Sequence, residues 1–130
     1  MTANRSWMIV TMIVIVATVS GCSSELPEME MIDNNQALQY VTVCQYGLAM
    51  AKVDKMMQSM DEETRAEAAL VKAVVYLDQN DVKEAEALYP TIIAGNKKYK
   101  TIDDARKAVE GLVKNVRAVR KQNRGSEYCN

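Results

Sequence analysis

The chain contains no histidine and no phenylalanine, and its few aromatic residues are one tryptophan and six tyrosines. Without histidine, it lacks the side chain that most often serves as a general base and as a metal ligand. The sequence also contains no glycine-rich phosphate-binding loop, nucleophile elbow or paired-cysteine zinc motif. We therefore expect a non-catalytic protein without a metal site, and the sequence indicates no small-molecule substrate.

Since aromatic residues are scarce, the core must consist of alanine, valine, leucine, isoleucine and methionine, which suit closely packed helices better than a sheet. Apolar residues make up 48% of the chain and charged residues 25%, a composition that is typical of globular domains and argues against disorder. A chain of 130 residues is long enough for one domain and too short for two. We expect an all-α fold, a small bundle of about four helices.

Long apolar runs are also rare, and the one that stands out extends from Trp7 to Val19, after a positive charge at Arg5. As a helix it would span about 20 Å, whereas the hydrocarbon core of a bilayer is ~30 Å thick. The run therefore fits the apolar core of an export signal better than a membrane span. An ordinary secretory signal and an uncleaved anchor remain alternatives to a lipoprotein signal.

The apolar run ends in Val19-Ser20-Gly21-Cys22, which resembles the lipobox of bacterial lipoproteins. The resemblance implies that residues 1–21 are a cleaved signal peptide and that Cys22 carries a covalent diacylglycerol and an N-acyl chain. No other cofactor is implied. In Gram-negative lipoprotein families, a serine directly after the lipidated cysteine resembles the signal that directs the protein to the outer membrane. By this resemblance, Ser23 indicates an outer-membrane lipoprotein.

Residues 22–33 resemble a tether, since they contain two serines, a proline and several acidic residues. The eleven residues that follow Cys22 in this segment reach at most about 40 Å, so the following domain, residues 34–130, must stay close to its membrane. A partner of this domain must be found there too. The acidic residues of the tether are Glu25, Glu28, Glu30 and Asp33.

The spacing of apolar residues predicts two helices in the first half of the domain, over about 34–59 and 59–79. Ser59 and Glu62 form a plausible capping box for the second helix. The expected inward faces are Ala37, Val41, Cys44, Leu48 and Ala51 in the first helix, and Ala66, Leu70, Ala73 and Leu77 in the second.

Two more helices are predicted in the second half. Asp81 with Glu84 can cap the third, which Pro90 should kink or interrupt and Gly95-Asn96 should end. Thr101 and Asp104 match a capping box for the last helix, whose final turns are rich in basic residues. The expected inward faces are Val82, Ala85, Leu88 and Ile92 in the third helix, and Ile102, Ala105, Val109, Leu112, Val116 and Val119 in the last.

One stretch weakly resembles a single tetratricopeptide helix pair. Its matching positions are Tyr76, the Asn80-Asp81 turn, Ala85 and Tyr89. Such repeats need about three copies to stack, and the sequence contains only one. A generic helical hairpin is the favoured interpretation.

Once Cys22 is used for lipid attachment, Cys44 and Cys129 are the two remaining cysteines. An even pair in an exported domain favours a disulfide, which would attach the end of the chain to the first helix. The alternatives are two free thiols or a bond to another chain.

The last helix also carries many basic residues: between Lys97 and Arg124 there are ten basic and three acidic residues. The default interpretation is a solvated surface, and contact with anionic lipid head groups or with an acidic partner is the alternative. Nucleic acid is not expected, because no aromatic residues alternate with these charges. The candidate residues for a partner or for lipid are Lys107, Lys114, Arg117, Arg120, Lys121 and Arg124.

These observations favour a membrane-anchored envelope protein that acts as an adaptor and binds another envelope protein through a helical surface. The expected architecture is similar to that of the small helical pilotins of type II secretion, which hold a short secretin helix in a groove. No pilotin motif can be matched residue by residue. Two alternatives stay open: a phage- or plasmid-encoded lipoprotein that blocks superinfection or DNA entry, and a structural protein that contacts peptidoglycan.

Overall fold

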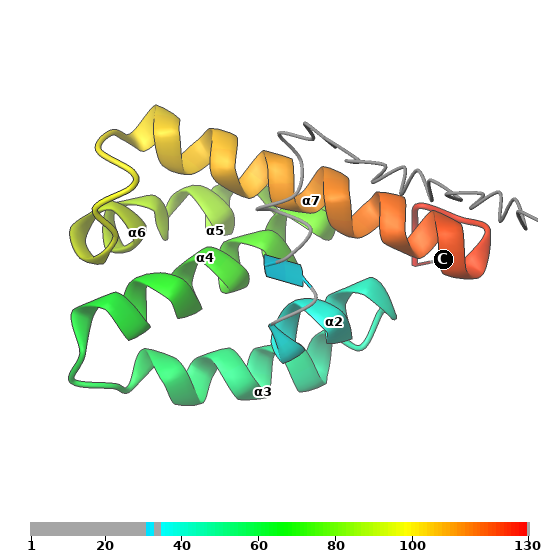
Figure 1. The fold of residues 1–130 in the computed structure, drawn as a ribbon, viewed down its shortest axis with the longest axis horizontal. Helices are drawn as coiled ribbons and strands as arrows, with labels where there is room; N and C mark the ends of the chain where they lie inside the picture. Colours follow the sequence, from blue (N-terminus) through cyan, green and yellow to red (C-terminus); the bar gives the residue numbers. More distant parts are fainter. Residues whose placement is uncertain (1–30, 33–34, 130) are drawn as a thin grey trace, which may run out of the picture.

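A computed structural model describes residues 31–32 and 35–129. Within these ranges the regular secondary structure is all helical, without strands, which confirms the expected all-α bundle (Figure 1). The predicted signal peptide, residues 1–21, the predicted lipidation site Cys22 and most of the tether lie outside the described residues. Among the residues that are described, no helix combines the length and the apolar character needed to cross a membrane. The helices are α2 (Gln36–Thr42), α3 (Tyr46–Met57), α4 (Glu62–Asp78), α5 (Val82–Glu86), α6 (Tyr89–Gly95) and α7 (Ile102–Arg124).

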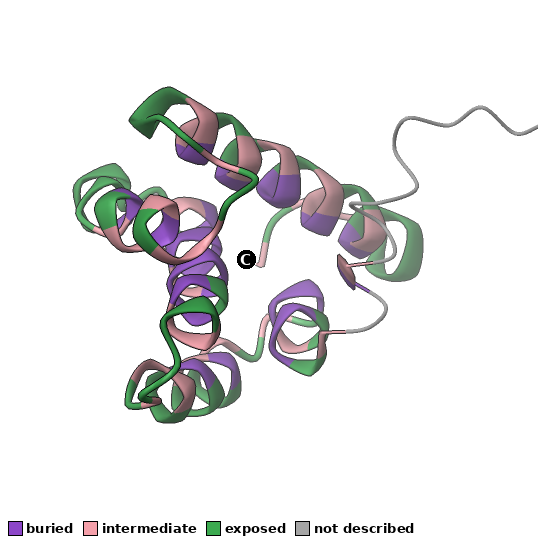
Figure 2. Cartoon of the chain, turned by 60° about the vertical axis from the view of Figure 1, so that its left-hand side comes forward, coloured by how far each residue is buried: buried purple, intermediate pink, exposed green. Residues whose placement is uncertain are grey.

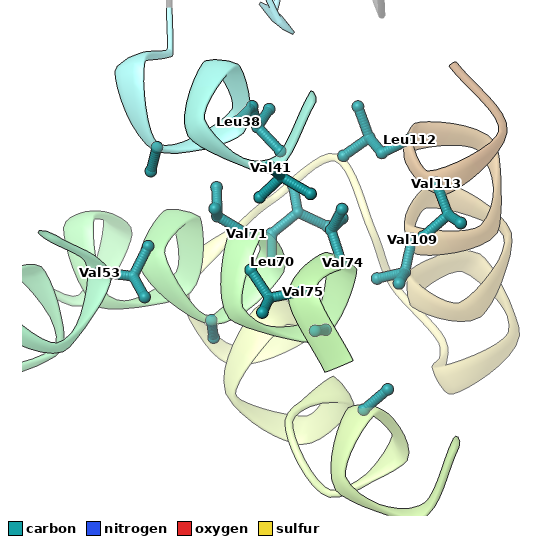
Figure 3. Close-up of a cluster of buried hydrophobic side chains, with 14 of the residues drawn as sticks. Leu38, Val41, Val53, Leu70, Val71, Val74, Val75, Val109, Leu112 and Val113 are labelled. Atoms are coloured by element: carbon teal, nitrogen blue, oxygen red, sulfur yellow. The ribbon is translucent and has the colours of Figure 1, made fainter. Parts of the chain in front are cut away.

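Helix α4 lies at the centre of the bundle, between α3 on one side and α7 on the other (Figure 1). The buried surfaces of the surrounding helices turn toward it (Figure 2). It is buried on more than one side, because it packs against α3, α6 and α7 at once. The close-up in Figure 3 shows its contribution to the core, the residues Leu70, Val71, Val74 and Val75, between side chains of α2, α3 and α7.

The first predicted helix, 34–59, is in fact two helices, and the expectation of one continuous helix is wrong. The chain turns between α2 and α3, where Cys44 adopts a left-handed backbone conformation with φ 64°. A turn at this place changes which residues face the core. Leu48 and Ala51, expected inside, are exposed, while Ala49 and Val53 are fully buried.

The predicted helix caps are mostly confirmed. The side chain of Asp81 accepts a hydrogen bond from the backbone N–H of Glu84, and Thr101 forms the reciprocal capping box with Asp104. The cap of α4 was predicted two residues too early: Asp61, rather than Ser59, accepts the bond from the N–H of Thr64, at 2.9 Å.

The third predicted helix is interrupted as expected around Pro90, which lies in the first turn of α6. A proline fits there because the first N–H groups of a helix have no partner within the helix. Two inward predictions at helix starts are wrong: Val82 at the start of α5 and Ile102 at the start of α7 are exposed. Helix termini project beyond the packed centre, so the apolar stripe of each helix reaches further than the core does.

Two residues that the sequence analysis placed in the tether belong to the packed part of the protein. Ile32 is 3% exposed and Met31 packs against the core. The tether before the core is therefore shorter than predicted, since Met31 and Ile32 already pack against the bundle.

Helices α4 and α6 approach each other closely at Gly95, the last residue of α6. A Cβ atom at this position would overlap the carbonyl oxygen of Glu62 and would lie 2.7 Å from the Cβ of Ala66. Side-chain carbon atoms do not pack at such distances, so any larger residue must push the helices apart. The spacing between α4 and α6 thus depends on this glycine.

We predict that Gly95→Ala lowers the free energy of unfolding by about 1–3 kcal/mol, because the methyl group overpacks the contact with α4. The measurement is urea unfolding followed by circular dichroism. Gly47→Ala is the matched control, since nothing lies within 4 Å of the position of its added Cβ. It should leave stability unchanged or raise it slightly, and an equal loss in both variants would contradict the packing argument.

Candidate functional site

The end of α4 carries a buried carboxylate, Asp78, whose side chain is 1% exposed. It accepts hydrogen bonds from Arg120 Nη2 at 2.7 Å and from Arg117 Nε at 3.0 Å, both in α7. The hydroxyl group of Tyr46, at the start of α3, donates a third bond at 2.6 Å. Three helices therefore meet at one carboxylate.

Arg120 extends this network to the ends of the folded domain. Its guanidinium group donates to the carbonyl oxygens of Val41 in α2 and Glu127 in the C-terminal segment, each at 2.6 Å. The side chain of Arg120 is 1% exposed, and its Nε is the one buried side-chain nitrogen or oxygen without a hydrogen-bond partner among the described residues. A charge this deeply buried is stable only because it is paired and hydrogen-bonded.

The predicted disulfide between Cys44 and Cys129 is present, with 5.6 Å between the two Cα atoms. It lies beside the ion-pair network: the Tyr46 hydroxyl oxygen is 2.9 Å from Cys129 Sγ. The disulfide and Arg120 thus hold the same C-terminal segment against α2 and α3.

The environment fixes the protonation states of this network. Burial alone would raise the pKa of the Asp78 carboxyl, but the hydrogen bonds from Arg120, Tyr46 and Arg117 outweigh it and hold the pKa below its usual value. Burial and the hydrogen bond to Asp78 raise the pKa of Tyr46 to about 12. At neutral pH the carboxylate is therefore ionised and the tyrosine is protonated, so Tyr46 can donate its hydrogen bond to Asp78.

The structure divides the six predicted basic candidates into two groups. The prediction that Arg120 belongs to an exposed stripe is wrong, because Arg120 is buried on Asp78. Arg117 also turns toward Asp78 and lies 5.3 Å from the ring centre of Tyr128. Arg124 donates to the carbonyl oxygen of Val43, although its side chain is exposed.

The other group remains on the surface. Lys107, Lys114 and Lys121 are exposed and lie seven residues apart, so they form one stripe opposite the buried face of α7. Of the three, Lys107 pairs with Asp103 at 2.9 Å. A groove runs along each side of this stripe, and the two grooves share no lining residue.

We name the first of these two grooves the α4–α7 groove. It has a volume of about 380 Å³. Its apolar lining comes from the end of α4 and the middle of α7, and charges of both signs surround it. The lining residues are Leu77, Asn80, Glu110, Val113, Lys114, Arg117 and Glu127.

The second, which we name the lysine groove, has a volume of about 350 Å³ and lies where the chain before α2 meets the loop before α7. Three of its lining residues are lysines and one is acidic. The lining residues are Met31, Lys98, Tyr99, Lys100, Asp104, Lys107, Ala108 and Leu112.

Sequence reasoning missed the buried network and most of the lysine groove. Asp78, Tyr46 and Tyr99 were not singled out by the sequence analysis. One signal for Arg120 was available: it follows Val116 by four residues and therefore continues the buried stripe of α7 as well as Val119 does.

Comparisons of the chain with protein-family models, with curated proteins and with solved structures find no match. The resemblance of residues 76–89 to one tetratricopeptide helix pair, and that of residues 19–22 to a lipobox, therefore stay predictions.

We predict that Asp78→Asn lowers the free energy of unfolding by about 3–5 kcal/mol, because it leaves the buried Arg120 guanidinium without its counter-charge. The measurement is denaturant unfolding with the disulfide intact. Asp54→Asn is the matched control. It removes the partner of Lys72 in a pair whose aspartate is 52% exposed, and it should cost no more than about 1 kcal/mol. Equal effects in the two variants would show that the buried pair has no special role.

Proposed function

We propose that this chain is a lipid-anchored protein of the bacterial cell envelope that acts as a non-catalytic adaptor and binds another envelope protein in the α4–α7 groove. The observation that carries this proposal is the order of features at the N-terminus: a positive charge, a short apolar run and then Val19-Ser20-Gly21-Cys22. A lipid on Cys22 would restrict the domain to a narrow zone next to the membrane. Ser23 favours the outer membrane as the one that holds the lipid.

The α4–α7 groove is the part of the domain that best fits a helical segment of a partner. Its floor contains Leu77 and Val113. Its rim carries two basic residues, Lys114 and Arg117, and two acidic residues, Glu110 and Glu127. Amphipathic helices bind in such grooves through apolar residues on one face and ion pairs at the edges. The occupant we propose is therefore an amphipathic helix with charges of both signs beside its apolar face.

The walls of this groove are held in place before a partner arrives. Arg117 at its rim is bonded to Asp78, and Glu127 belongs to the segment held by Arg120 and by the disulfide. A preformed groove loses little conformational entropy when it is occupied, so even a small contact area can give useful affinity. This geometry supports an adaptor that binds a rigid or helical motif.

We predict that a photoreactive amino acid in place of Lys114, in the groove, cross-links to one specific envelope protein in living cells. The same replacement of Ala51, which is exposed on α3 away from α7, is the matched control and should give no such product. The products are identified by mass spectrometry.

In the Cys22→Ala background the product at position 114 should disappear, because the domain is released from its membrane. The same pattern of products from positions 114 and 51, or no product from either, would contradict the adaptor proposal. Products that contain peptidoglycan would favour the structural alternative instead.

A further inference from the structure

The lysine groove lies in a basic part of the chain. Residues 97–108 contain five basic and two acidic residues. Lys98 and Lys100 are exposed, and the ammonium group of Lys98 lies 5.8 Å from the ring centre of Tyr99. The lining is apolar below these charges, at Leu112 and Ala108. The groove thus combines cationic edges with an amphipathic aromatic ring and an apolar floor.

The two acidic residues nearby do not cancel this charge. The carboxylate of Asp104 accepts hydrogen bonds from the backbone N–H groups of Lys100 and Thr101, at 3.0 and 3.1 Å, and thereby caps α7. Asp103 contacts Lys107 and Arg106 at the surface, where such pairs are weak and easily exchanged. Among the described residues, neither Lys98 nor Lys100 forms an ion pair with an acidic residue, so their positive charge remains available to an anionic surface.

The path of the chain brings this groove close to the predicted lipid anchor. Met31 lines the groove and is the first residue that the structure describes. Cys22 precedes it by nine residues, which can reach at most about 32 Å. If Cys22 is held in a membrane, Met31 and the lysine groove that it lines therefore lie within about 32 Å of the anchor.

We propose that the lysine groove faces the bilayer that holds the anchor and binds the anionic phosphate groups of its phospholipids. This inference rests on the lipid anchor of the proposed function, and it adds the orientation of the domain relative to the membrane. Lysines bind phosphates as flexible point charges, and tyrosine rings favour the level of the head groups, where one end is apolar and the other is hydrated. Since the two grooves share no residue, an occupied lysine groove leaves the α4–α7 groove open to a partner.

The test uses the mature protein purified from membranes and placed in vesicles, with an amine-reactive reagent and mass spectrometry as the readout. In vesicles of equimolar phosphatidylcholine and phosphatidylglycerol, Lys98, Lys100 and Lys107 should react more slowly than in phosphatidylcholine alone. Lys55 on α3 and Lys83 on α5 are exposed internal controls and should react equally in both.

A matched pair of variants tests the role of the groove itself. Each lysine near an anionic surface strengthens binding about fivefold, so Lys100→Gln should lower the ratio of docked to undocked domain by about that factor and reduce the protection of Lys98 and Lys107. Lys121→Gln makes the same change of charge near the far end of α7, outside the groove, and should leave the protection unchanged.

Several results would overturn the inference. Equal reactivity of the groove lysines in both kinds of vesicle excludes binding of head-group charge, and equal protection of Lys55 and Lys83 excludes a preferred face. Protection in native membranes but not in the vesicles would assign the groove to an acidic protein. The mass of the N-terminal peptide shows whether the proposed function or only this inference has failed. An unlipidated Cys22 would contradict both. A lipidated protein whose groove lysines stay reactive would contradict this inference alone.

Discussion

The buried ion pair between Asp78 and Arg120 is the interaction on which the rest of this domain depends. It joins the end of α4 to α7, and through the carbonyl oxygens of Val41 and Glu127 it also fixes α2 and the C-terminal segment. The free energy needed to remove two charges from water exceeds the attraction between them in a simple ion pair. A buried pair is therefore stable only when its remaining donors and acceptors also form hydrogen bonds. The hydrogen bonds from Tyr46 and Arg117 provide this satisfaction around the carboxylate.

The same network shapes the outer surface of α7. Because Arg117 and Arg120 turn toward Asp78, the outer stripe of the helix is left to three lysines, with one groove on each side. One groove adjoins the first described residue of the chain and has a basic rim, while the other lies over the end of α4 and has a mixed rim. If the domain is anchored as we propose, it can present one side of α7 to the bilayer and the other side to a protein partner.

The sequence was sufficient to predict the elements whose signals are local. The apolar stripe and capping box of α7 and the break at Pro90 follow from spacing and backbone chemistry. The pairing of Cys44 with Cys129 was the favoured one of three alternatives once Cys22 was assigned to lipid, and the structure contains it. The turn at Cys44 could not be found in this way, since the apolar spacing continues through it without interruption. The residue at this turn has a left-handed backbone conformation and forms the disulfide with Cys129, 85 residues later in the chain.

The buried charges show a different limit. Arginine and aspartate are rarely buried, so a sequence argument places them on the surface unless a partner is visible. Asp78 and Arg120 are 42 residues apart in the chain, and only the packing of α4 against α7 brings them together. For the same reason the lysine groove could not be predicted, since it is formed by Met31, the loop before α7 and the first turns of α7.

The most direct test of this account is a carbon NMR titration of the Asp78 side-chain carboxyl in the protein with its disulfide intact. We expect this carboxyl to titrate below the ordinary aspartate pKa, because the hydrogen bonds from Arg120, Tyr46 and Arg117 outweigh the effect of burial. A pKa at or above the ordinary value would mean that the arginines do not surround the carboxylate, and the central interaction of the fold would be wrong.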